Sequence, residues 1–155
     1  MFRVSRLLVA AALTLAITAP VVPAQAAATL APLFTVPGMT NGGTLGTFFA
    51  CTNTDVVPLN VGIDEFGQNG TQLVTAASNA VSLSPQSTVL FATTSALGFA
   101  VDVNINPGIV TKGSAVIWTT GKKVACSAFL ADNGNNPPIS MTTLTIVAKG
   151  KQKGD

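Results

Sequence analysis

The chain lacks histidine and tyrosine altogether, and its only arginines are Arg3 and Arg6. Histidine is the commonest general base near neutral pH, so the usual acid–base and nucleophilic reaction schemes have no obvious agent here. Arginine is the side chain that clamps phosphate or carboxylate groups in a two-pronged manner. The nucleophile motif Gly-x-Ser-x-Gly is missing as well. These absences predict a protein that is not an enzyme and that holds no cofactor.

Charge is also scarce, because Asp, Glu, Lys and Arg together make up 9% of the residues. The formal net charge of +2 comes from Arg3 and Arg6, since the six lysines are balanced by six acidic residues. A neutral remainder with scattered lysines and no alternation of aromatic and basic residues argues against nucleic-acid binding. The surface is instead expected to be rich in Thr, Ser, Asn and Gly, and copies of such a surface repel one another only weakly.

The N-terminal residues have the pattern of a secretory signal peptide, Met1–Ala26. Two arginines precede an uncharged apolar run over 7–19, prolines 20 and 23 end that run, and Ala24-Gln25-Ala26 matches a signal peptidase site. The run is shorter than the roughly 20 apolar residues that a membrane span needs. Cleavage after Ala28 fits as well. We therefore expect a secreted protein, periplasmic or extracellular, with no stable membrane insertion after cleavage.

Two cysteines, Cys51 and Cys126, follow the expected signal peptide. In an oxidising compartment a disulfide between them is the default interpretation. Two free thiols or half of a metal site are the alternatives, and the second has no histidine or third cysteine to complete it. The sequence thus predicts one disulfide that joins an early strand to a late one.

Short runs rich in Val, Ile, Thr and Phe alternate with Gly, Pro, Asn and Asp, which is typical of all-β domains. The clearest strand is 57–66, which has apolar residues at alternate positions and is followed by the turn sequence Asn69-Gly70. Further strands are expected over 33–36, 48–53, 71–75, 80–83, 87–94, 99–105, 114–120, 123–132 and 141–149. By geometric analogy, eight or nine strands drawn from these ten segments predict a single immunoglobulin-like β-sandwich, with Trp118 as a core ring near the disulfide.

The expected organisation has four parts. They are the signal peptide (1–26), an N-terminal arm or first strand (27–40), the β-sandwich domain (41–149) and a flexible polar tail (150–155).

Candidate chemistry is sparse. Asp64 and Glu65 are neighbours on one strand, so their side chains point to opposite faces, and Glu65 is expected at the rim of the apolar face. A glycosidase pair would need distant residues such as Asp64 and Asp102, which nothing in the sequence brings together. The segments 102–108 and 132–138 faintly resemble calcium loops, but each is explained as well by a strand end or a polar turn. We therefore expect no metal site.

Two functions remain. The first is a structural, fimbrial-type or adhesive subunit that associates with itself or with another protein through β-edges. One form of this hypothesis uses residues 27–40 as a mobile arm that pairs with a neighbour. The second is a monomeric module that binds a carbohydrate or a protein, for which Trp118 is the leading aromatic candidate.

Overall fold

A computed structural model describes residues 29–149. The predicted signal peptide (1–26) and polar tail (150–155) lie outside the described residues, so both stay predictions. Within 29–149, no helix is long and apolar enough to cross a membrane.

The described residues form eleven strands and one short helix. In chain order these are β1 (Ala31–Asn41), β2 (Leu45–Asn53), β3 (Leu59–Gly67), β4 (Gln72–Val74), α1 (Ala76–Asn79), β5 (Val81–Leu83), β6 (Thr88–Ala92), β7 (Val103–Asn104), β8 (Val110–Thr119), β9 (Val124–Asp132), β10 (Met141–Thr143) and β11 (Val147–Ala148). The predicted all-β class is confirmed. The final predicted strand, 141–149, is divided into β10 and β11.

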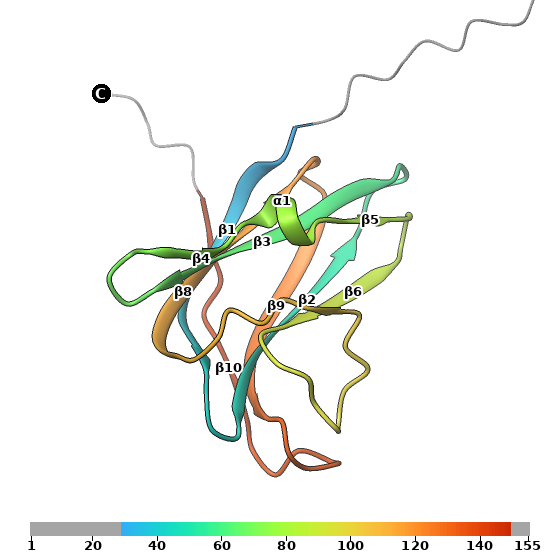
Figure 1. Cartoon of the computed structure of the whole chain (residues 1–155). Coiled ribbons are helices and arrows are strands. Elements are labelled where there is room, and N and C mark those ends of the chain that lie inside the picture. The colour runs from blue at the N-terminus through green and yellow to red at the C-terminus, as the bar shows by residue number, and fades with distance from the viewer. Residues whose placement is uncertain (1–28, 150–155) are drawn as a thin grey trace, which may run out of the picture.

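The strands make two sheets, which Figure 1 shows facing each other. One is six-stranded with the order β11-β1-β8-β3-β4, and β5 also pairs with β3. The other is five-stranded with the order β10-β9-β2-β6-β7. Every pairing is antiparallel except that of β6 with β7. Because β10 and β11 belong to different sheets, the last part of the chain crosses from one sheet to the other.

The main core lies between the sheets and follows from the alternation of apolar residues along each strand. Its fully buried side chains include Val36 on β1, Phe49 on β2, Ile63 on β3, Phe91 on β6 and Ile117 on β8. A second cluster lies on the opposite face of the five-stranded sheet. There Phe48, Phe99 and Phe129 bring their ring centroids within 4.8–5.5 Å of one another.

The predicted disulfide between Cys51 and Cys126 is present. The two residues lie directly opposite each other on β2 and β9, which are neighbours in the five-stranded sheet. In antibody domains the corresponding bond joins the two sheets. The immunoglobulin-like arrangement therefore stays a prediction, and the position of the disulfide differs from that analogy.

The segment proposed as a mobile arm is, in its described part, an interior strand. Residues 31–41 form β1, which lies between β11 and β8, and its Val36 and Met39 are completely buried. β8 pairs with β1 from Ala31 to Asn41 and β11 pairs with it at Phe34 and Thr35, so this segment is part of the sheet and not a free arm.

Candidate functional site

A groove on the outer face of the six-stranded sheet is the candidate site, because it joins an aromatic ring to polar side chains. Its volume is about 540 Å³, within the range of roughly 300–1,000 Å³ that is usual for small-molecule sites. The lining is Thr29, Leu30, Asp64, Gln72, Thr75, Ala76, Ala77 and Trp118. It therefore combines an indole ring and small apolar side chains with a carboxylate, an amide and hydroxyl groups.

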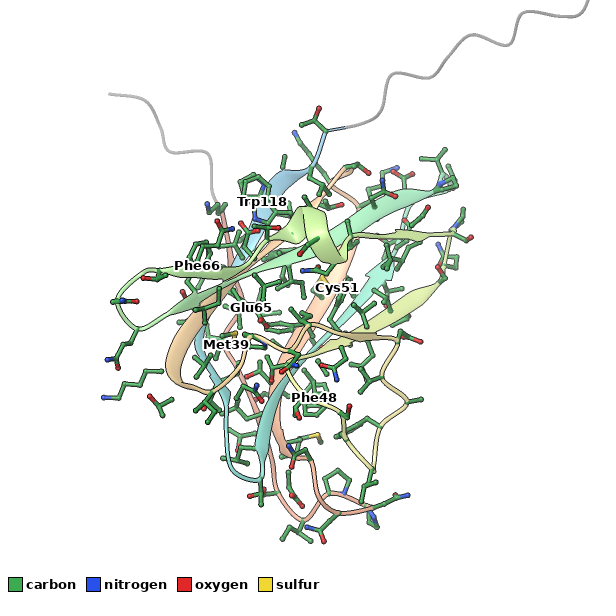
Figure 2. The ribbon with its side chains drawn as sticks, in the orientation of Figure 1. Met39, Phe48, Cys51, Glu65, Phe66 and Trp118 are labelled. Carbon is green, nitrogen blue, oxygen red and sulfur yellow. A yellow bond between two sulfur atoms is a disulfide. The ribbon has the colours of Figure 1, made fainter. Side chains whose placement is uncertain are left out.

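Trp118 supplies the aromatic wall of the groove. It lies on β8 between Pro32 of β1 and Gly62 of β3, and it is half-buried. The prediction of a core ring beside the disulfide is wrong, because Ala115, Ile117 and Thr119 fill the inner face of β8 and Trp118 takes the outer face. In Figure 2 the residue lies beside α1, at a distance from Cys51.

The indole Nε1–H is buried and donates to no acceptor in residues 29–149. Most buried polar groups in proteins have a hydrogen-bond partner. Within residues 29–149 the indole N–H is thus an exception to this rule, together with the two carboxylate oxygens of Glu65.

Asp64 is the polar counterpart of Trp118. Its side chain is only 6% exposed, and its Oδ1 accepts a hydrogen bond from the backbone N–H of Ala76. Its Oδ2 accepts no hydrogen bond from any described residue and is free to accept one from a ligand. Since Ala76 holds the carboxylate in one orientation, the acceptor has a fixed position on the groove wall.

The helix α1 forms the opposite wall because β3 makes room for it at Gly62. A Cβ atom at that position would overlap the carbonyl oxygen of Ala76. Between β4 and β5 the chain leaves the sheet, so Ile63 of β3 has no neighbouring strand on that side. The side-chain amide of Asn79 satisfies the backbone groups of Ile63 instead. Its Oδ1 accepts from Ile63 N–H, and its Nδ2 donates to the Ile63 carbonyl, both at 2.8 Å. The helix is therefore fixed to the sheet beneath it.

Glu65 has no part in the groove, although it follows Asp64 in the chain. The two side chains point to opposite faces as predicted, but Glu65 does not lie at a rim. It is completely buried between the sheets, and neither carboxylate oxygen has a hydrogen-bond partner within the described part of the chain. Removal from water raises its pKa to about 8. The neighbouring carboxylates therefore cannot act together on one substrate.

The two segments that resemble calcium loops use their carboxylates for local structure. Asp102 Oδ2 accepts from the backbone N–H of Leu90 at 2.8 Å. Asp132 accepts from the side-chain amide of Asn135 and from the backbone N–H of Gly134, and these bonds lower its pKa. Residues 29–149 contain no cluster of three or more potential metal ligands of the His, Cys, Asp and Glu types.

The structure also separates the hypothetical glycosidase pair. Asp64 lies on β3 in the six-stranded sheet, while Asp102 accepts a hydrogen bond from β6 in the five-stranded sheet. Neither is placed to share a substrate with the other.

Of the groove residues, the sequence pointed to Trp118 and Asp64 as candidate site residues, but not to Leu30, Gln72 or Thr75. Those three carry no motif: Gln72 lies on β4, Leu30 directly precedes β1 and Thr75 directly precedes α1, and the pairing of the strands brings these elements together.

Comparisons with known proteins add little to this description. No family model and no curated protein sequence matches the chain. Among solved structures, "Crystal Structure of Thermotoga maritima 1070" is similar with a TM-score of 0.49 and 13% identity, over 74% of this chain and 91% of that chain. A likeness at this level supports no statement about function.

Proposed function

We propose that the protein is a secreted, non-enzymatic binding module and that the groove beside Trp118 takes a neutral carbohydrate. The observation that carries this proposal is the pairing of an aromatic ring with a nearly buried, fixed carboxylate in one groove of about 540 Å³.

The chemistry of the lining matches a sugar ring. An aromatic surface accommodates the apolar C–H face of a sugar, and carboxylate and amide oxygens accept hydrogen bonds from its hydroxyl groups. Asp64 Oδ2, the Gln72 side chain and the Thr75 hydroxyl can serve in this way. None of the lining residues is a lysine or an arginine, so the groove offers no counterion to a phosphate, sulfate or uronate group. A neutral glycan is therefore favoured over an anionic one.

Secretion is part of this proposal. It is supported by the sequence pattern of Met1–Ala26 and by the Cys51–Cys126 disulfide, which is a bond typical of oxidising compartments. The immunoglobulin-like strand arrangement and the lack of an enzymatic activity stay predictions.

A second candidate function, association as a structural or adhesive subunit, is favoured by a different observation. The five-stranded sheet ends in an exposed strand, β10, whose flanking sequence has no charge. That edge is independent of the groove, which lies on the other sheet.

The groove contains its own reporter, because Trp118 is the only tryptophan and the chain has no tyrosine. We expect neutral oligosaccharides selected from a glycan array to shift and enhance the Trp118 emission in a saturable titration. Asp64→Asn should weaken binding about tenfold or more, since hydrogen bonds to a charged group are worth roughly 1.5–3 kcal/mol. Trp118→Ala, measured by calorimetry, should abolish measurable binding.

Phe66→Ala is the matched control. Phe66 is a half-buried aromatic residue on the same strand and face as Asp64, but it does not line the groove. It should leave the affinity unchanged. Binding that survives Trp118→Ala, or no response of the emission to any neutral glycan on the array, would contradict the proposal.

A further inference from the structure

The strand β10 forms an outer edge of the five-stranded sheet. Asp132 N–H donates to the Ser140 carbonyl at 3.1 Å, Leu144 N–H donates to the Ala128 carbonyl at 2.8 Å, and Thr142 lies opposite Leu130. Even-numbered residues therefore turn their backbone groups toward β9. Because these groups alternate along a strand, Met141 and Thr143 turn theirs outward. In the described chain, nothing bonds to those outward groups.

Edges of this kind are usually protected by charged side chains, proline or a covering loop. The two prolines here, Pro137 and Pro138, lie before the strand and not within it, and the whole stretch 133–148 contains no charged residue. Asp132, immediately before it, is almost fully buried and is occupied by Gly134 and Asn135. The edge therefore has no charge to repel a second strand.

The same edge exposes apolar side chains. Ile139, two residues before β10, is 82% exposed, and Met141, the first residue of β10, is 64% exposed. Met141 lies opposite Ala131, so its side chain projects on the outer face of the sheet, where Phe129 also lies. A strand added at this edge would extend that apolar face and remove Met141 from water.

We propose that two copies of this chain associate by antiparallel pairing of β10 with β10, about a two-fold axis at Thr142. Met141 of one copy then lies opposite Thr143 of the other, and about four backbone hydrogen bonds form across the axis. The five-stranded sheets become one continuous sheet through both copies. The groove beside Trp118 lies on the other sheet, so dimerisation does not depend on the proposed function.

A second copy fits this edge better than a foreign strand for two reasons. A second copy presents an edge of the same length that is also uncharged, so the four outward backbone groups of Met141 and Thr143 in each copy all find partners. An acidic or basic peptide would find no charge of opposite sign within 133–148 to select it.

Sedimentation equilibrium of the mature protein over a wide concentration range should show a monomer–dimer equilibrium. Thr143→Pro removes the outward N–H while leaving the inward bonds of Thr142 intact, and it should weaken dimerisation about tenfold or more. Ala148→Pro is the matched control. Ala148 also turns its N–H outward, because the N–H of Lys149 is the one that donates to β1, but it lies on the edge of the other sheet.

Disulfide trapping tests the register without relying on a proline. Residues facing each other across a non-hydrogen-bonded position have Cα atoms close enough for a disulfide. Thr142→Cys should therefore give a covalent dimer under mild oxidation, whereas Thr145→Cys, an exposed position between β10 and β11, should not. A protein that stays monomeric at every concentration overturns the proposal. So does a dimer that Thr143→Pro leaves unaffected, or one that Thr142→Cys does not trap.

Discussion

Glu65 makes the stability of this protein depend on pH in the direction opposite to that of most carboxylates. Its folded-state pKa is about 8, against an ordinary value of 4.5. The folded state therefore holds a proton that the unfolded state releases above pH 4.5, and the free energy of unfolding falls as pH rises from about 4.5 to about 8. Glu65→Gln removes this dependence. Its effect on the free energy of unfolding should therefore be more stabilising at pH 7 than at pH 4, by up to about 3 kcal/mol.

Urea denaturation at pH 4, 7 and 9 measures this effect. Asp55→Asn provides the opposite control, because the Val56 N–H and the Lys123 ammonium lower the pKa of Asp55. Its contribution to stability is present at neutral pH and is lost as pH falls through the folded-state pKa. An effect of Glu65→Gln that is the same at pH 4 and pH 7 would mean that Glu65 is ionised in the folded protein.

At the residue scale, the sequence predicts which face of the sheet a side chain occupies only where the odd- and even-numbered positions of the strand differ in polarity. Residues 57–66 alternate clearly, so the inward direction of Val61 and Ile63 and the opposite directions of Asp64 and Glu65 were correctly predicted. In 114–120 one parity holds Ser114, Val116 and Trp118 and the other holds Ala115, Ile117 and Thr119. Each set contains both polar and apolar residues, so composition could not show that the ring of Trp118 lies on the outer face.

At the scale of elements, every predicted strand position has a strand in the structure, but α1 was missed. Its four residues are too few to show helical periodicity. The boundary between β4 and β5 depends on one side chain, Asn79, which stands in for a paired strand at Ile63. The sequence shows Asn79 as one of many turn-type residues, and only its spatial position against β3 reveals its role.

Asn79→Ala should therefore destabilise the protein more than its partial exposure suggests. It leaves the Ile63 N–H and carbonyl without partners, at a cost of roughly 1–3 kcal/mol for each group that stays dry. It should also loosen α1 and lower the affinity of the adjacent groove. Ser78→Ala is the control from the same helix, because it removes only an exposed hydroxyl bond to Thr75. Urea unfolding monitored by Trp118 emission checks both variants, and equal losses would contradict the role assigned to Asn79.

At the scale of the whole molecule, the all-β class and the disulfide were predictable, while the pairing of strands was not. The strands β1 and β8 pair through residues such as Thr35 and Val116, which lie far apart in the chain, and no local pattern encodes such a register. The groove depends on this long-range pairing. Asp64, Gln72 and Trp118 come from three strands and meet only because β4, β3 and β8 are consecutive in the sheet.

The disulfide stabilises the molecule chiefly through its unfolded state, because of where it lies in this topology. Cys51 and Cys126 are 75 residues apart, yet β2 and β9 are already paired along nine successive positions. The native sheet therefore does not need the bond. In the unfolded chain the bond closes a long loop, which in the chain-entropy model contributes about 4.5 kcal/mol.

The double substitution Cys51→Ala with Cys126→Ala should keep the native near-ultraviolet spectrum and Trp118 emission in the absence of denaturant. It should lower the free energy of unfolding by roughly 2–5 kcal/mol. It should also increase the denaturant m-value, since an unlinked unfolded chain exposes more surface. Chemical reduction of the unsubstituted protein is the control, because it removes the same link without a change of side chain. Loss of the native spectrum in both samples, before any denaturant is added, would show instead that the bond holds the folded sheets together.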